Sequence, residues 1–264
     1  MLNSVLVKLQ AERNKLNMFF LALSVFFVAV VYSSAGFGGA SGYLLVMNFF
    51  DIPANVMAST ALVLNIFVSS ISFTNYVRAG HFRSRLLIPF LITSIPAAFI
   101  GGTLKISEQA YTILLYIVLT HLAFRMTLFP TLTEKHDWEP RPIPLWAALL
   151  SGAVIGLLSG MLGIGGGIFL SPLIILMQWG NAKQAAASAG GFIAINSVSG
   201  LVGRVAGGTF AFGEFGIPLL AVGLLGALIG SRLGAVNFSG AGVRRALGTI
   251  LVIAVGTYWF NFFK

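Results

Sequence analysis

A glycine-rich motif occurs twice in this sequence, each time within a long apolar run. The first copy, SSAGFGGASGYLL, covers residues 33–45, and the second, SGMLGIGGGIFLSP, covers residues 159–172. Clustered glycines interrupt a helix, because glycine loses the most backbone freedom on ordering. In hydrocarbon a broken helix is tolerated only where protein or a water-lined cavity satisfies the freed backbone groups. A pair of such interruptions at matching places in two halves of a chain indicates a transporter's binding site.

The composition is that of a helical membrane protein. Of 264 residues, 57% are hydrophobic and 9% are charged, and the mean hydropathy is +0.93, whereas a soluble domain carries roughly 25% charged residues. The net charge of +9 comes from Lys and Arg scattered over short loops, which fits orientation in a lipid bilayer better than nucleic-acid binding. Without cysteine the chain has no disulfide framework, thiolate metal site or Cys nucleophile.

The apolar runs predict eight membrane-spanning helices. Most runs are close to the ~20 residues that cross the hydrocarbon of a bilayer. They cover residues 17–35, 54–77, 86–104, 110–129, 145–162, 185–203, 216–234 and 244–263. Two shorter apolar pieces, at 40–50 and 167–178, follow the glycine motifs. Both are too short to span, so each is predicted to be a half-helix or re-entrant segment.

The two motifs belong to a longer internal repeat. Identical residues recur at a nearly constant offset: Ser59 and Ser188, Pro89 and Pro218, and Gly101 and Gly230. The sequence therefore predicts an all-α integral membrane protein with two homologous four-helix halves, each containing a Gly-broken half-helix. The N-terminal repeat covers 1–129, a polar linker covers 130–144, and the C-terminal repeat covers 145–264. Four crossings per half would make the halves parallel, whereas counting the short segment as a crossing would invert the second half.

The distribution of Lys and Arg predicts an orientation. Eleven of the 16 fall on one predicted side: Lys8, Arg13, Lys15, Arg78, Arg83, Arg85, Arg125, Lys135, Arg141, Arg204 and Lys264. The opposite side holds the others: Lys105, Lys183, Arg232, Arg244 and Arg245. Because cytoplasmic loops carry the excess of Lys and Arg, both termini are expected in the cytoplasm.

GFGGASG followed by an apolar run, its copy GIGGGIFLSP and the duplicated four-helix pattern resemble the TauE/SafE family of sulfite and organosulfonate exporters. The resemblance covers nearly the whole chain. It implies transport of small sulfur-containing anions, such as sulfite or sulfonates, across the bacterial inner membrane. The first copy differs from the second, because Ala40 replaces the third consecutive glycine and no proline stands where Pro172 does. The two halves are therefore expected to contribute unequally to a site.

The half-helix starts are the predicted binding site. Helices that begin near Gly39–Ser41 and Gly166–Ile168 would present unpaired N–H groups at membrane depth, and these groups and the helix dipole favour an anion. The small residues that would let substrate approach the backbone are Gly38, Gly39, Ser41, Gly165, Gly166 and Gly167. Ser41 is also the predicted cap of the first half-helix. The alternative is that these glycines only allow close helix packing.

Polar side chains on the next helix of each half extend this site. The neutral candidates are Ser59 and Asn65 in the first half, and Ser188, Asn196 and Ser199 in the second. Neutral donors suit an anion that must be released, but interhelical hydrogen bonds, worth about 0.6 kcal/mol on average, are the alternative. Arg204 is the cationic candidate, and its alternative is a snorkelling arginine at the interface. His121 and Glu214 are candidates for proton exchange, with a packed histidine and a loop carboxylate as the alternatives.

The sequence therefore predicts a secondary transporter, and specifically an exporter, with no catalytic residues, cofactor or metal site. The GFGG cluster lacks the GK[ST] ending of a phosphate-binding NTPase loop. The alternatives are an uncoupled anion channel or facilitator, and a membrane enzyme or assembly subunit that transports nothing. Protons are the candidate coupling ion, and the oligomeric state is left open, with a homodimer as one option.

Overall fold

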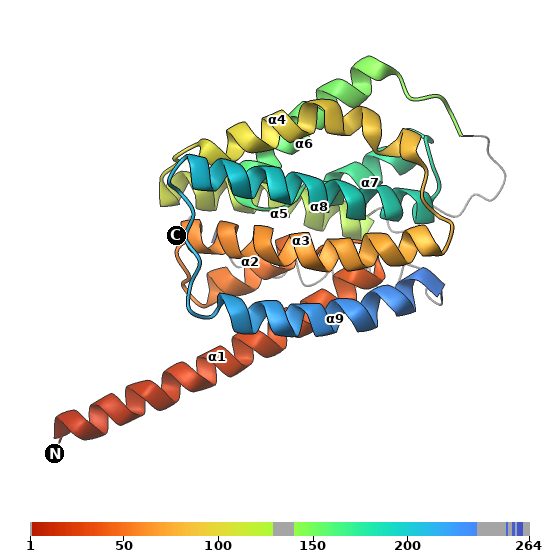
Figure 1. Ribbon diagram of the computed structural model, residues 1–264. Coiled ribbons are helices and arrows are strands. Elements are labelled where there is room, and N and C mark those ends of the chain that lie inside the picture. The colour runs from red at the N-terminus through yellow and green to blue at the C-terminus, as the bar shows by residue number, and fades with distance from the viewer. Residues whose placement is uncertain (1, 129–139, 237–251, 253–254, 257, 261–264) are drawn as a thin grey trace.

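The structure is a computed structural model that describes residues 2–128, 140–236, 252, 255–256 and 258–260 (Figure 1). Every element within the helix-bearing ranges 2–128 and 140–236 is helical. In chain order the elements are α1 (Leu2–Ser34), α2 (Ala40–Phe49), α3 (Ala54–Arg78), the short 3₁₀ helix η1 (Ser84–Leu86), α4 (Ile88–Thr103), α5 (Glu108–Leu128), α6 (Leu145–Leu162), α7 (Gly167–Leu176), α8 (Ala182–Ala206) and α9 (Gly216–Val236).

Six helical segments of the described chain are long and apolar enough to cross a membrane. They are Leu16–Ser34, Ala54–Arg78, Ser84–Thr103, Leu145–Leu162, Ala182–Ala206 and Gly216–Gly234. All six coincide with predicted spans. The predicted span at 110–129 forms α5, which is not among the six, and the one at 244–263 falls largely outside the described residues. The total of eight spanning helices therefore stays a prediction.

The two predicted half-helices are present. The helices α2 and α7 have 10 residues each, or about 15 Å, which is half of the hydrocarbon thickness. Each follows a glycine in the left-handed region, Gly39 with φ 97° and Gly166 with φ 78°. A residue with a side chain rarely adopts this conformation, so glycine is what allows the chain to turn into each half-helix.

Close glycine contacts fix the direction in which neighbouring helices run. A β-carbon added to Gly226 of α9 would meet the carbonyl of Phe26, and one added to Gly234 would meet that of Ser34, so α9 is parallel to α1. Gly152, Gly156 and Gly160 of α6 meet successive carbonyls of α4 in the same manner, at Phe90, Ser94 and Ala98. Glycines therefore allow close packing of neighbouring helices in this bundle, including Gly160 of the second motif.

The bundle has two ends, which Figure 1 shows at the right and at the left. At the linker end lie the loops 79–87, 140–144 and 177–181, where the Arg141 amide donates to the Gln178 carbonyl at 2.9 Å. At the α1 end, where the first helix begins, lie the loops 50–53, 104–107 and 207–215. There the Ala211 amide donates to Ser59 Oγ at 3.2 Å.

Corresponding helices of the predicted halves run in opposite directions. The helices α1, α3 and α9 run toward the linker end, and α4, α6 and α8 run toward the α1 end. The long helices α3 and α8 are antiparallel, since Gly190 lies against Phe73 and Gly200 against Leu62. Of the two arrangements that the sequence left open, the directions fit the inverted one, in which each glycine loop and its half-helix together count as a crossing.

This arrangement corrects the predicted grouping of positive charges. Arg204, expected on the side of Arg78, lies near the end of α8 at the α1 end. Arg232, expected on the opposite side, flanks the same cleft as Arg78 near the linker end. The start of α1 and residues 140–144 of the linker also lie at opposite ends of the bundle. The predicted grouping was wrong because it treated the glycine loops as interruptions of a helix rather than as part of a crossing. The predicted orientation, with both termini in the cytoplasm, rested on this grouping and therefore loses its basis.

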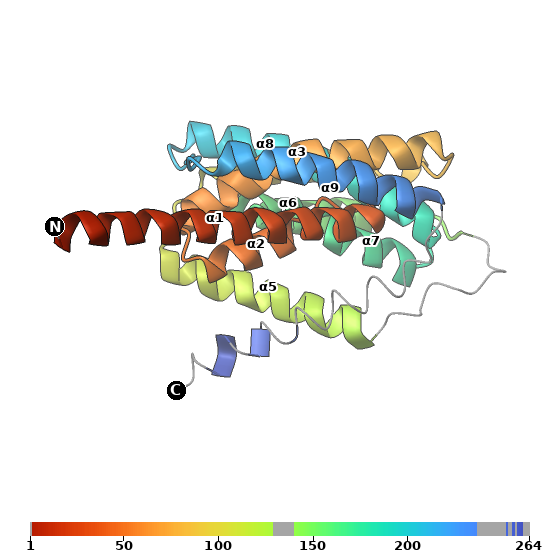
Figure 2. The ribbon, with the colours of Figure 1, turned by 90° about the horizontal axis from the view of Figure 1, so that it is seen from below.

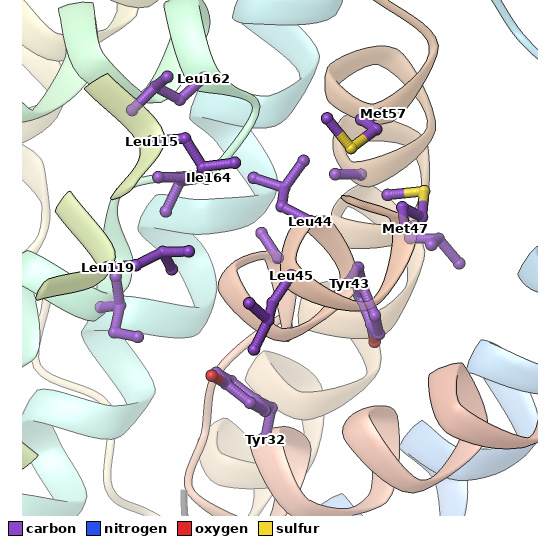
Figure 3. Close-up of a cluster of buried hydrophobic side chains, with 14 of the residues drawn as sticks. Tyr32, Tyr43, Leu44, Leu45, Met47, Met57, Leu115, Leu119, Leu162 and Ile164 are labelled. Atoms are coloured by element: carbon purple, nitrogen blue, oxygen red, sulfur yellow. The ribbon is translucent and has the colours of Figure 1, made fainter. Parts of the chain in front are cut away.

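The first half-helix shares its core with the second glycine motif. In Figure 2, α2 lies between α1 and α5, and Asn48 Nδ2 of α2 donates to Tyr116 Oη of α5 at 3.0 Å. Figure 3 shows the buried side chains that join these parts: Leu44 and Leu45 of α2, Leu115 and Leu119 of α5, and Leu162 and Ile164 of the second motif. Residues far apart in sequence are thereby held in one packed cluster.

Candidate functional site

The chain segments that connect α1 to α2 and α6 to α7 are buried, although they are not helical. We call residues 35–39 the first glycine loop and residues 163–166 the second. All residues from 32 to 45 and from 162 to 168 are buried. Loops usually run over the surface, because buried irregular backbone leaves polar groups that need partners. In a membrane protein such backbone is tolerated where protein surrounds it or where it lines a cavity, which is typical of transporter binding sites.

Each glycine loop packs against the long helix of the other half. A β-carbon added to Gly36 would lie 2.6 Å from the β-carbon of Ala186 in α8, and one added to Gly163 would lie 2.6 Å from the Ala58 carbonyl oxygen in α3. Both glycines also have positive φ, 83° and 78° respectively. Any side chain at these positions would be strained by its backbone and would collide with the facing helix.

The two loops meet at Asn65 of α3. A β-carbon on Gly38 would lie 2.5 Å from Asn65 Oδ1, and one on Gly165 would lie 2.8 Å from Asn65 Nδ2. Both would also come within 3.0 Å of the Ile193 side chain of α8. Asn65 Nδ2 has only a long hydrogen bond, 3.5 Å to the Gly163 carbonyl, and its Oδ1 has no partner within the described chain. The structure thus brings together three predicted site residues, Gly38, Asn65 and Gly165.

Ser197 is a site residue that sequence reasoning missed. Its Oγ would lie 3.1 Å from a β-carbon on Gly165, and this hydroxyl is buried with no hydrogen-bond partner in the described residues. It lies four residues after Ile193 and therefore on the same face of α8. The predicted Ser199 lies elsewhere, because its hydroxyl donates to the Ile95 carbonyl of α4 at 2.6 Å. Because only the structure shows that Ile193 faces the loops, the sequence alone does not distinguish these two serines.

Asn196 and Ser188 are buried on α8, as a site on this helix requires. Asn196 Nδ2 donates to the Phe192 carbonyl at 2.9 Å, while its Oδ1 has no partner among the described residues. The Ser188 hydroxyl is likewise without a partner there. Ser59, which aligns with Ser188, instead accepts a hydrogen bond at the α1 end and donates to the Asn55 carbonyl at 2.8 Å. Ser59 is therefore not brought to the centre with Asn65.

The predicted cap of the first half-helix is wrong. The N-cap position of α2 is Gly39, which makes no side-chain cap. Ser41 lies within the first turn instead, and its hydroxyl donates to Tyr32 Oη of α1 at 2.9 Å. The first turn of α2 therefore receives no side-chain acceptor for its N–H groups from the N-cap residue, a condition that suits an anionic ligand.

Gly39, Gly166 and Gly167 lie against side chains and backbone at the half-helix starts. A β-carbon on Gly39 would lie 2.7 Å from the Tyr43 ring, and one on Gly166 would lie 2.7 Å from the Ile155 side chain. One on Gly167 would lie 2.5 Å from Ile193 Cγ1. Polar atoms lie there too: a β-carbon on Gly39 would be 2.7 Å from Tyr43 Oη, which is buried with no partner among the described residues, and one on Gly167 would be 2.5 Å from the Ala189 carbonyl oxygen. These three predicted site residues are therefore packed at the half-helix starts.

Arg204 is buried and binds the end of α6. Its side chain is 5% exposed, so it does not snorkel to the interface. The guanidinium Nη2 donates to the carbonyls of Gly160 at 3.3 Å and Met161 at 2.6 Å, and Tyr111 Oη donates to the next carbonyl, that of Leu162, at 2.9 Å. These are last-turn carbonyls that α6 itself cannot satisfy. Arg204 and Tyr111 therefore hold the backbone that enters the second glycine loop.

The start of the first glycine loop is held in a similar way. The Ser72 hydroxyl of α3 donates to the Ser33 carbonyl at 3.2 Å, and Tyr76 Oη donates to the Ser34 carbonyl at 3.0 Å. Both acceptors are last-turn carbonyls of α1, which ends at Ser34. Each loop is thus anchored at its start by polar side chains. Neutral hydroxyl groups hold the first loop, and the Arg204 guanidinium together with the Tyr111 hydroxyl holds the second.

The two candidates for proton exchange lie at the surface. His121 of α5 is exposed, and its ring centroid is 6.5 Å from that of Phe169 in α7. Glu214 is exposed at the α1 end, where it lines a cleft of about 500 Å³ with Asn17 and Phe50. In the described residues the buried centre between the glycine loops is therefore lined by neutral groups.

Comparisons with known proteins identify the family of the chain. The sequence model of the family described as "Sulfite exporter TauE/SafE" matches residues 21–258. A Sinorhizobium fredii protein described as "Probable membrane transporter protein" is 35% identical over 240 residues, which is 89% of this chain and 95% of that protein. A Methanocaldococcus jannaschii protein with the same description is 26% identical over 224 residues, 79% of this chain and 82% of that protein. No solved structure matches significantly. The chain is a multi-pass membrane protein that belongs to the sulfite exporter TauE/SafE family.

Proposed function

We propose that this protein is a secondary transporter that exports small sulfur-containing anions, such as sulfite or organosulfonates, across the bacterial inner membrane. The family description and the two relatives described as membrane transporters support the transport function. The sulfur-containing substrate and the export direction come from the family description alone. The two homologous repeats, 1–129 and 145–264, are part of this proposal. Their support is that α6 packs on α4 as α1 packs on α9, which are corresponding pairs.

One observation carries the proposal: two glycine loops, each leading into a half-helix, converge on the buried Asn65 amide, whose oxygen has no hydrogen-bond partner in the described residues. The N-termini of α2 and α7 are both directed into this region and carry positive partial charge. Asn65 Nδ2 and the Ser197 hydroxyl supply neutral donors beside them. An oxyanion matches these donors, and the neutral lining that the described residues supply allows its release.

The site is buried, so the anion must be admitted by movement of the surrounding helices. A carrier that alternates between the two ends of the bundle fits this closed centre better than an open channel does, because a channel needs a continuous path. Inverted halves supply such alternation through rocking of one half against the other. Protons remain the proposed coupling ion, and a homodimer is the oligomeric state that we propose to test.

The test is a binding and transport series on the purified protein. Sulfite, thiosulfate, sulfoacetate, taurine and sulfate would be titrated by calorimetry, and each ligand that binds would then be followed in proteoliposomes. We expect saturable binding of at least one sulfur oxyanion and counterflow of labelled anion, which a channel does not produce. An imposed pH gradient should accelerate transport if protons are coupled. Saturable binding of none of the five anions would overturn the proposal.

A further inference from the structure

A second site lies on the outside of the bundle, between α3 and α9. Here a cleft of about 290 Å³ is flanked by Arg78 and Arg232. Arg78 is the last residue of α3, and Arg232 lies four residues before the end of α9. Both side chains are exposed, and no carboxylate of the described chain pairs with either of them. Two cations on neighbouring helices repel one another, so the cleft favours an anion between them.

Hydroxyl groups extend the cleft along α3. Ser70, Thr74 and Arg78 are spaced four residues apart and therefore form one ridge of the helix. The Ser70 hydroxyl donates to the Ile66 carbonyl at 2.5 Å, and the Thr74 hydroxyl donates to the Ser70 carbonyl at 2.8 Å. Each oxygen keeps a lone pair, so the ridge can accept a hydrogen bond from a ligand hydroxyl. The cleft thus offers guanidinium donors at one end and hydroxyl acceptors beside them.

The surface around this cleft is apolar. On α9 the side chains of Leu225, Ile229 and Leu233 are 57%, 48% and 39% exposed, and Leu228 is part of the cleft wall. Both helices are long and apolar enough to cross a membrane. Exposed aliphatic side chains on such helices face acyl chains. The arginines, near the helix ends, are at the level of the phospholipid headgroups.

We infer that this cleft binds the headgroup of an anionic phospholipid from the surrounding bilayer. The guanidinium groups bind the phosphate, and the acyl chains lie along Leu228 and its apolar neighbours, toward the bilayer centre. Arginine suits this role because its planar fork matches two phosphate oxygens. This site is separate from the glycine loops and does not rest on what they transport.

The experiment is a lipid titration followed by native mass spectrometry. The purified protein, the double variant R78Q/R232Q and the double variant R83Q/R85Q would each be titrated with phosphatidylglycerol and with phosphatidylcholine. Arg83 and Arg85 are a matched control, because they are exposed in the 79–87 loop at the same end of the bundle and lie outside the cleft. Both double variants lose the same charge. Thermal unfolding would verify that all three proteins are folded.

We expect the wild type and R83Q/R85Q to bind phosphatidylglycerol more tightly than phosphatidylcholine. R78Q/R232Q should lose this preference, with affinity falling about fivefold per arginine removed. Equal losses in the two double variants would overturn the site, and so would equal binding of the two lipids by the wild type. A third arm uses glycerol 1-phosphate as a soluble competitor. Displacement of the lipid at equimolar competitor would contradict a lipid site and indicate a site for free phosphate esters.

Discussion

Asn65 of α3 and Gly165 of the second glycine loop are in such close contact that a β-carbon on Gly165 would lie 2.8 Å from the Asn65 amide nitrogen. The side chain of a helix in one half thus lies against the backbone of a loop in the other. Gly38, in the loop of the first half, lies against the oxygen of the same amide. The two polar atoms of Asn65 therefore face the two glycine loops, and the predictions for binding centre on it.

The first prediction is that Gly38→Ala lowers anion affinity about tenfold, or about 1.4 kcal/mol. Its β-carbon would lie 2.5 Å from Asn65 Oδ1 and must displace the amide. Unlike Gly39 and Gly166, Gly38 has no positive φ, so alanine adds no backbone strain. Leucine at Gly39 or Gly166 would instead combine strain with collisions against Tyr43 or Ile155. Those variants cannot separate packing from binding.

Gly256→Ala is the control for this substitution, because a β-carbon there meets nothing within 4 Å. Titration of both variants with the tightest sulfur oxyanion measures the effect. If Gly38→Ala bound the anion as tightly as Gly256→Ala does, the space beside Asn65 would have no role in binding.

The second prediction concerns Arg204, whose removal should lower stability more than it lowers anion affinity. Arg204→Ala leaves two carbonyls at the end of α6 without their donor, and an unsatisfied buried group typically costs about 1–3 kcal/mol. Arg204→Lys keeps a charged donor but loses the planar fork, so the unfolding temperature should fall in the order wild type, Lys, Ala. Thermal unfolding in detergent measures this order.

Lys105→Ala is the matched control, since Lys105 is an exposed cation at the same end of the bundle. It should unfold at the wild-type temperature. An Arg204→Ala protein that keeps wild-type stability yet binds the anion at least tenfold more weakly would show that the guanidinium contacts the substrate directly.

The third prediction is about sidedness. The chain contains no cysteine, so single cysteines can be introduced near the two ends of the bundle and labelled with a membrane-impermeant thiol reagent. Lys183→Cys should label from the same side of the membrane as Arg141→Cys, and Glu214→Cys from the side of Lys105→Cys. The sequence-based charge grouping instead places Lys183 on the side opposite Arg141. Labelling of Glu214→Cys from the Arg141 side would exclude the inverted directions of the helices.

Local features of the fold were predictable from the sequence. The starts of α2 at Ala40 and α7 at Gly167 fall where the glycines were expected to release the chain into half-helices. Hydrocarbon length and glycine conformation are local properties, so they can be inferred from a single sequence. Asn65 was also predicted as a site residue, because a neutral donor on the helix that follows the half-helix suits an anion that must be released.

Features that depend on tertiary contacts were not predictable. Ser197 and Ser199 look equivalent in sequence, and only the packing of α8 decides that the first faces Gly165 and the second faces α4. The partners of Arg204 are backbone carbonyls more than forty residues away, which no side-chain pattern reveals. The predicted grouping of charges failed for the same reason, since it required knowing that each glycine loop and its half-helix together cross the bundle.

The central claim is that an anion binds between the two glycine loops at Asn65. Its most direct test is the affinity for sulfite, or for the tightest sulfur oxyanion found, in the wild type, Asn65→Asp and Asn55→Asp. Asn55→Asp is the same chemical change on the same helix, at an exposed position in the first turn of α3. Gel filtration and thermal unfolding would verify that both variants are folded.

Placing a carboxylate beside a bound anion costs several kcal/mol, so Asn65→Asp should weaken binding by about thirtyfold or more. Asn55→Asp should bind like the wild type, and Asn65→Ser, which keeps a neutral donor, should bind between the two. Wild-type affinity in a folded Asn65→Asp protein would contradict the account, because no anion could then bind between the loops.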